Sequence, residues 1–232
     1  TLSPSSAASD VYKRQVQDMA LEKLHVVLAV DRCGIVGADG ETHHGCLDYL
    51  SQIPGMTVLA PASFAELRQM LRRAVLEMNG PVAVRYPRGG EDGYDGDCGA
   101  ESVTVLRQGT DAAIVTYGIL TQQALRAAAL LAGEGVSARV VKLNRAAPLD
   151  SDGICRALAG VKRIVAAEDQ LRAGAVGERL GALLLEQGAG TEKLVLRSVG
   201  TTLPSQGSTV ELRHALGLDA EGIAQAVREV LA

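Results

Sequence analysis

The chain has 232 residues, of which 47% are hydrophobic and 22% are charged, with 26 glycines and a formal net charge of -4. This composition is typical of a soluble α/β protein, and no apolar run is long enough to span a bilayer. Without such a run, a membrane is not expected as a partner. Interspersed charges, a single Phe and no Trp leave neither a basic stripe nor a stacking platform, so nucleic acid is not expected either.

The four cysteines, Cys33, Cys46, Cys98 and Cys155, are too scattered for a zinc site and too few for a disulfide scaffold. We therefore expect reduced thiols and a cytoplasmic location.

Residues 1–15 are small and polar and show no apolar periodicity. The run SSAASDVYKRQ resembles the in-frame translation of an adaptor used to prepare sequencing libraries. We expect a non-native segment joined to a gene fragment at Val16, although an ordinary disordered terminus is the alternative. Either reading excludes the segment from fold reasoning.

Residues 16–97 form the first expected domain portion, in which strand and helix signals alternate as in βαβ units. The expected elements are strands at 25–30, 57–61 and 81–86, a short helix near 45–51 and a helix over 64–78. Ser63 is the expected N-cap of the longer helix, with Glu66 completing a capping box. The glycine- and acid-rich stretch 87–101 is typical of an interdomain linker.

Residues 98–232 form the second expected domain, which is long enough for its own core. The expected strands lie near 103–107, 112–117, 138–143, 162–167 and 193–198, and the expected helices near 120–133, 151–159, 174–187 and 219–231. The alternation predicts mostly parallel sheets with flanking helices.

The run from Asp31 to Gly45, DRCGIVGADGETHHG, directly follows the apolar strand 25–30. In open α/β sheets ligands bind just past the carboxyl ends of the strands, so this loop is the first candidate site. Arg32 follows one strand and Arg88 another, and both project from the same sheet edge if the two strands are neighbours. Guanidinium groups bind phosphate oxygens in a bidentate manner. Alternatively, each arginine simply pairs with Asp31, or with Glu91 and Asp92.

Asp39 and His43 are four residues apart in this loop, and an imidazole can exchange protons with a substrate oxygen near neutral pH. The alternative for His43 is a histidine that satisfies a loop carbonyl, and for His44 we favour that interpretation. A zinc site from His43, His44 and Cys46 lacks a fourth ligand, so we predict no metal site.

This loop, followed by LSQIPGMTVLAPASFAELRQML and GPVAVRYPRG, resembles the second half of the 1-deoxy-D-xylulose-5-phosphate synthases, thiamine-diphosphate enzymes of the transketolase superfamily. The resemblance covers nearly all of the chain after residue 15. It implies a truncated pyrimidine-binding domain followed by a transketolase-type C-terminal domain, and a homodimeric parent enzyme. It implies that the parent acts on pyruvate and glyceraldehyde 3-phosphate.

The resemblance also assigns roles to residues. Arg32 and Arg88 match the pair that holds the phosphate of glyceraldehyde 3-phosphate, whereas Asp39 and His43 match positions that face the thiazolium and the substrate oxygens. In the C-terminal domain, Glu168 and the PSQG turn at 204–207 are interpreted as structural.

The family's diphosphate- and Mg²⁺-binding motif and its ring-activating glutamate are expected upstream of Val16. Because the cofactor carries the carbanion chemistry, we expect this chain to bind neither group tightly and to be inactive alone. Three alternatives stay open: a 2-oxo acid dehydrogenase β subunit, a transketolase-like protein and a non-catalytic assembly module. Arg32 together with Arg88 discriminates against the dehydrogenase, which has no sugar phosphate to hold.

Overall fold

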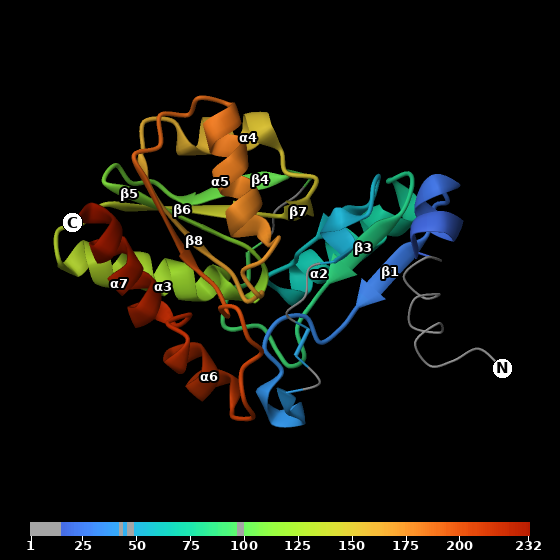
Figure 1. The fold of residues 1–232 in the computed structure, drawn as a ribbon, viewed down its shortest axis with the longest axis horizontal. Helices are drawn as coiled ribbons and strands as arrows, with labels where there is room; N and C mark the ends of the chain where they lie inside the picture. The colour runs from blue at the N-terminus through green and yellow to red at the C-terminus, as the bar shows by residue number, and fades with distance from the viewer. Residues whose placement is uncertain (1–14, 42–43, 46–48, 97–99) are drawn as a thin grey trace.

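The computed structural model describes residues 15–41, 44–45, 49–96 and 100–232, which form two sheets with helices packed around them (Figure 1). The order in the four-stranded sheet is β1-β3-β2-β7, and in the five-stranded sheet it is β4-β6-β5-β8-β9. Pairing is parallel except at β7 and β4, which lie antiparallel to β2 and β6. The predicted class, α/β with mostly parallel sheets, is confirmed.

The strands of the four-stranded sheet are β1 (Val27–Val30), β2 (Thr57–Leu59), β3 (Val82–Arg85) and β7 (Arg145–Ala147). Those of the five-stranded sheet are β4 (Val103–Arg107), β5 (Ala112–Thr116), β6 (Ala138–Leu143), β8 (Arg163–Ala167) and β9 (Lys193–Arg197). The α-helices are α2 (Phe64–Leu76), α3 (Thr121–Gly133), α4 (Ser151–Leu158), α5 (Val176–Glu186), α6 (Thr209–Ala215) and α7 (Ala220–Leu231). Shorter helical segments are a π-helix at Gln15–Leu21 and 3₁₀ turns at Gly37–Asp39, Leu50–Gln52 and Gly118–Leu120.

Most expected elements are present within two residues of their predicted bounds, but β7 and α6 were not predicted. The short helix expected near 45–51 is a 3₁₀ turn over Leu50–Gln52, and residues 46–48 lie outside the described residues. Strand β7 lies in the second half of the chain and completes the edge of the first sheet. A three-residue strand pairs through its backbone and carries too few side chains for an alternating pattern.

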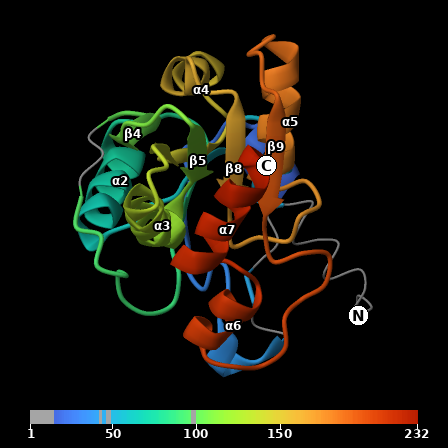
Figure 2. The same ribbon diagram turned by 90° about the vertical axis from the view of Figure 1, so that its left-hand side faces the viewer.

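One buried cluster extends from the first sheet to the second. Because strand residues alternate between faces, the first sheet contributes side chains to this cluster and to another on its opposite face. Val58 and Ala83 of the first sheet belong to the same buried cluster as Val115 and Val141 of the second. The opposite face of the first sheet packs on α2 through a separate cluster that includes Met70. In the second domain, α4 and α5 cover one face of the sheet and α3 and α7 cover the other (Figures 1 and 2).

A buried ion pair joins α2 to the second sheet. The Ser63 hydroxyl accepts the Glu66 N–H at 3.1 Å, which confirms the predicted N-cap. The Glu66 carboxylate does not return to Ser63 as a capping box requires. One oxygen accepts the Ala62 N–H at 2.8 Å, and the other accepts a bond from Lys142 Nζ on β6, also at 2.8 Å. Both charged side chains are fully buried, so the carboxylate serves a contact between the domains as well as the helix end.

Strand β1 is the least covered strand of the first sheet. Within the described part of the chain it pairs with β3 alone, and Ala29 on it is exposed, whereas every residue of β3 is buried. Strands inside parallel sheets are normally buried on both faces and paired on both sides. Among the described residues, the second edge of β1 therefore has no strand partner for its backbone donors and acceptors.

Candidate functional site

The two predicted arginines follow the ends of two paired strands, at one edge of the first sheet. Strands β1 and β3 are parallel, with Val30 opposite Arg85 in the register. Arg32 follows the end of β1 by two residues, and Arg88 follows the end of β3 by three. The expectation that these strands are neighbours is therefore met, and the two loops leave the sheet side by side.

The guanidinium groups of Arg32 and Arg88 converge on the Asp39 carboxylate. Arg32 Nε lies 3.5 Å from Asp39 Oδ2, and Arg88 donates to Asp39 Oδ1. About half of each arginine side chain is exposed, at 47% for Arg32 and 52% for Arg88, compared with 22% for Asp39. The cluster is thus open to solvent, with both guanidinium groups in contact with the Asp39 carboxylate.

The simpler pairings considered from sequence are met only in part. Arg32 also binds Asp31, as that interpretation expects. Arg88, however, turns to Asp39, because its other expected partners are engaged elsewhere. Glu91 accepts the Phe64 N–H at 2.8 Å, and the Asp92 carboxylate contacts Gln123, Arg126 and Arg213.

Arg32 adopts an unusual backbone conformation for a residue with a side chain. Its φ is +56°, in the left-handed region that costs a non-glycine residue roughly 1–2 kcal/mol. Strain of this kind persists only where the surrounding structure enforces it, and it is concentrated at functional sites. Here it accompanies a guanidinium group directed toward Asp39.

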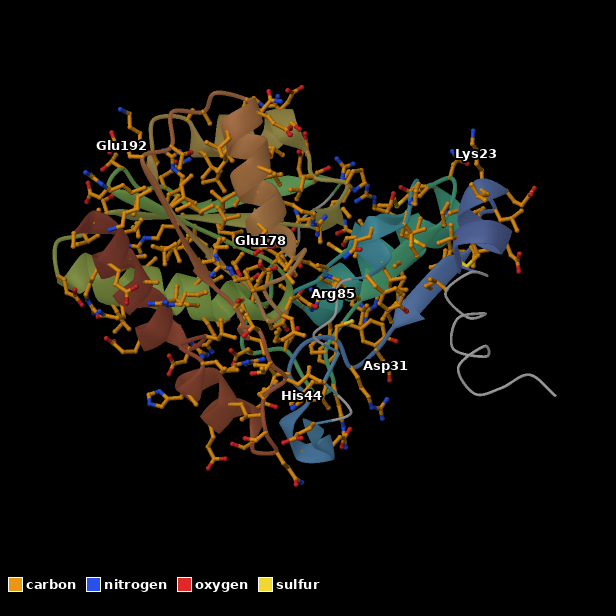
Figure 3. All side chains as sticks on the ribbon, in the orientation of Figure 1. Lys23, Asp31, His44, Arg85, Glu178 and Glu192 are labelled. Atoms are coloured by element: carbon orange, nitrogen blue, oxygen red, sulfur yellow. The ribbon has the colours of Figure 1, made fainter. Side chains whose placement is uncertain are left out.

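Histidine 43, predicted as catalytic, lies outside the described residues, as does Thr42. The neighbouring His44 is buried, and its Nδ1 accepts the Val36 N–H at 3.0 Å (Figure 3). It therefore satisfies a backbone N–H of the loop and not the carbonyl predicted from sequence. An Nδ1 that accepts must be unprotonated, which places the proton of the neutral ring on Nε2.

A cavity of about 200 Å³ lies beside the end of β3. Its lining is mostly apolar and includes Pro61, Phe64, Leu67, Tyr86 and Pro87, with Glu91 as its carboxylate. Tyr86 and Pro87 directly precede Arg88, so the cavity adjoins the arginine cluster along the chain.

A buried ion pair at the end of β3 was not predicted from the sequence. Arg85, at the end of β3, donates to Asp169 at 3.3 Å, and both side chains are 8% exposed. The Arg85 guanidinium also lies over the Tyr117 ring, 5.0 Å from its centre. Burial raises the pKa of the adjacent Cys33 thiol above its ordinary value of 9.0, although Arg85 opposes the shift. The sequence carried one signal for this pair, because polar residues directly follow the buried strand β8.

No group of three or more His, Cys, Asp or Glu side chains among the described residues is placed to hold a metal ion. We assign the described residues no step of thiamine chemistry. In the same part of the chain, no helix is long and apolar enough to cross a bilayer.

Two family models match this chain. Residues 8–90 match the transketolase pyrimidine-binding domain, and residues 101–223 match the transketolase C-terminal domain. The stretch between the two matches lies within the predicted linker.

Curated relatives carry a more specific name. The chain is 38% identical over 227 residues to the 1-deoxy-D-xylulose-5-phosphate synthase of Chlorobium luteolum, covering 92% of this chain and 35% of that protein. The protein of the same name from Heliobacterium modesticaldum is 39% identical over 230 residues, covering 94% and 35%. The chain thus spans about a third of the length of the relatives it matches.

A solved structure described as a split gene transketolase, in an inactive β4 tetramer, superposes with a TM-score of 0.83 at 29% identity. The superposition covers 97% of this chain and 73% of the other. Together with the match of the C-terminal domain model over more than half of the residues, these findings show that the chain belongs to the transketolase family.

Proposed function

We propose that this chain supplies the acceptor-phosphate side of a 1-deoxy-D-xylulose-5-phosphate synthase. The whole enzyme joins pyruvate, with loss of CO₂, to glyceraldehyde 3-phosphate. The product serves isoprenoid, thiamine and pyridoxal biosynthesis. Transketolase-type enzymes depend on thiamine diphosphate, which supplies the carbanion. The observation that carries the proposal is the convergence of Arg32 and Arg88 at the ends of two paired strands.

The charge pattern supports a phosphate as the ligand. Two exposed guanidinium groups directed at one point match the geometry and charge of a phosphate dianion. In this structure the Asp39 carboxylate takes that place. We infer that the substrate phosphate replaces Asp39 between the arginines, which frees the carboxylate to accept a hydrogen bond from a substrate hydroxyl. His43 is proposed to exchange a proton with the substrate oxygens from the same loop.

The arginine pair also separates this proposal from a 2-oxo acid dehydrogenase β subunit. A dehydrogenase subunit acts on no sugar phosphate and has no need of two guanidinium groups at this edge. The identities of 36–39% to relatives named as synthases point the same way.

We further propose that the remaining two thirds of the parent enzyme hold the diphosphate and Mg²⁺ and cover the open edge of β1. This chain by itself then has no synthase activity. Carboligation of pyruvate and glyceraldehyde 3-phosphate by the isolated chain, with thiamine diphosphate and Mg²⁺ added, would overturn this part of the proposal.

Kinetics of the full enzyme test the phosphate assignment. Arg88→Ala removes a charge-assisted hydrogen bond worth about 1.5–3 kcal/mol, so we expect the KM for glyceraldehyde 3-phosphate to rise roughly 10- to 100-fold. The KM for pyruvate should change little, because pyruvate has no phosphate. Equal rises in the two KM values would contradict the assignment.

A further inference from the structure

Three consecutive polar side chains after β8 are buried to an unusual degree. As whole residues, Glu168, Asp169 and Gln170 are only 3%, 6% and 1% exposed. Buried polar groups are costly unless they are paired, so each side chain should have a defined partner. Glu168 bonds to residues of its own domain, whereas Asp169 and Gln170 bond to residues of the first domain.

Glu168 serves the C-terminal domain. Its carboxylate accepts the Tyr117 hydroxyl at 2.8 Å and the N–H groups of Val176 and Gly177, at the start of α5, at 3.0 and 2.8 Å. This arrangement agrees with the structural role expected for Glu168 from sequence.

Asp169 and Gln170 instead reach the base of the candidate-site loop. We call this base the neck, defined as Cys33 and Gly34 together with Gly45. The Gly45 carbonyl accepts the Gly34 N–H at 2.9 Å and a hydrogen bond from Gln170 Nε2 at 3.4 Å. Gly34 has φ +78°, and a Cβ on it would overlap the Asp169 carboxylate. Only glycine fits at Gly34, because the carboxylate packs directly against its backbone.

Asp169 also holds the second arm of the site. It binds Arg85, the last residue of β3 and three residues before Arg88. The Cys33 N–H donates to the Tyr86 carbonyl at 3.0 Å, which ties the neck to the same segment. Figure 3 places Arg85 in the middle of the molecule, with Asp31 and His44 on the loop nearby. One carboxylate of the C-terminal domain therefore contacts both segments that carry the arginines.

The tip of the loop meets the same domain. The Gly207 N–H donates to the Gly37 carbonyl at 3.3 Å, and Ile35 packs in a buried cluster with Val199 and Leu212. Figure 2 shows α6 beside this part of the loop. The turn at 204–207, interpreted as structural from sequence, thus supports the loop tip.

We propose that Asp169 is a positioning residue, through which the C-terminal domain holds the neck and the end of β3 so that Arg32 and Arg88 converge on one anion. Gln170 assists at Gly45. The inference rests on the proposed phosphate site, but the hold on the neck is a separate physical statement that can be measured without ligand.

The test compares Asp169→Asn with Glu66→Gln in the 232-residue chain. Both variants break a buried ion pair between the domains, but of the two carboxylates it is Asp169 that packs against Gly34 of the neck. The hydrogen-exchange rates of the Cys33 and Gly34 amides measure local opening of the neck, and titration with inorganic phosphate measures the affinity of the site. We expect Asp169→Asn to speed exchange of these amides at least about tenfold and to weaken phosphate binding by a similar factor, whereas Glu66→Gln changes neither.

Equal acceleration of neck exchange in the two variants would show general loosening and overturn the proposal, as would unchanged exchange in Asp169→Asn. Arg88→Ala serves as the reference for the site itself. If it leaves phosphate affinity unchanged, the proposed function fails, and the exchange data alone decide whether Asp169 holds the neck. If Arg88→Ala abolishes binding but Asp169→Asn binds normally, the positioning role is wrong and the phosphate site stands.

Should Asp169→Asn fail to fold, Gln170→Met keeps the ion pair and removes only the bond to Gly45. A smaller acceleration of Gly34 exchange is then expected, and exchange identical to that of the unmodified chain would overturn the hold on the neck.

Discussion

At the scale of residues, the Asp39 carboxylate competes with any anion for the space between Arg32 and Arg88. A carboxylate about 5 Å from a bound phosphate in water-like surroundings costs on the order of 1 kcal/mol. We therefore expect Asp39→Asn to bind inorganic phosphate about fivefold more tightly, as measured by isothermal titration calorimetry. Asp31→Asn is the matched control, because among the described residues the Asp31 carboxylate pairs with Arg32 and not with Arg88, so it should give a smaller gain. Weaker binding by Asp39→Asn would show that the carboxylate does not occupy the phosphate position.

The buried Cys33 thiol predicts how stability depends on alkaline pH. Burial raises its pKa above 9.0 in the folded chain, so the folded state binds a proton more tightly than the unfolded state does. The resulting contribution to the free energy of unfolding is fully present below about pH 9 and is lost as the pH rises through the pKa of the folded chain.

Chemical denaturation at pH 8.5 and 10.5 checks this expectation. The free energy of unfolding should fall more in the unmodified chain than in Cys33→Ser, which has no thiol to titrate. Parallel losses in the two proteins would assign the alkaline instability to other groups.

The strand pattern predicted that Arg32 and Arg88 lie close together, but it did not predict that Asp169 supports them. Arg32 and Arg88 follow apolar strands of evident pattern, and their convergence required only that β1 and β3 be neighbours. Asp169, in contrast, lies more than 80 residues from Arg85, with which it pairs. The run AAEDQ shows polar residues after a strand, but nothing local indicates which domain each side chain faces.

At the scale of elements, the junction of the two domains depends on α2 and β6. Lys142 lies between Glu66 and Asn144 and 5.7 Å from the centre of the Tyr94 ring, which comes from the predicted linker. The linker therefore contributes the buried Tyr94 to this interface. Its glycine and acid content suggested only a connection, because composition carries no information on tertiary contacts.

This ion pair allows a direct test of the interface. Lys142→Met leaves the Glu66 carboxylate buried without its counter-charge, so we expect a loss of roughly 3–5 kcal/mol in the free energy of unfolding. The double variant Glu66→Gln with Lys142→Met removes both charges and should be more stable than Lys142→Met alone. Urea denaturation measures both values, and a double variant no more stable than the single one would show that the uncompensated charge is not the cause.

At the level of the whole molecule, one buried cluster spans both domains. Strand β7 from the second half of the chain pairs with β2, and the cluster containing Val58 and Ala83 continues into the second sheet. The alternation of strands and helices predicted each sheet separately. It could not predict that a strand from one block joins the sheet of the other, because such pairing depends on backbone geometry.

One edge of β1 has no strand partner in the part of the chain that the structure describes. Leu21 and Leu24 precede the strand and are 67% and 48% exposed, and Ala29 on it is exposed as well. An open parallel edge with exposed apolar neighbours is a surface that further protein is expected to cover. This agrees with a chain that spans about a third of the length of its curated relatives.

A comparison of two ligands of this chain shows directly whether Arg32 and Arg88 form a phosphate site. Calorimetric titration with glyceraldehyde 3-phosphate and with glyceraldehyde isolates the contribution of the phosphate. We predict that the phosphorylated compound binds measurably more tightly, that its affinity falls as salt is raised, and that Arg88→Ala removes the difference. Equal affinities for the two compounds, or a difference that survives in Arg88→Ala, would contradict the account.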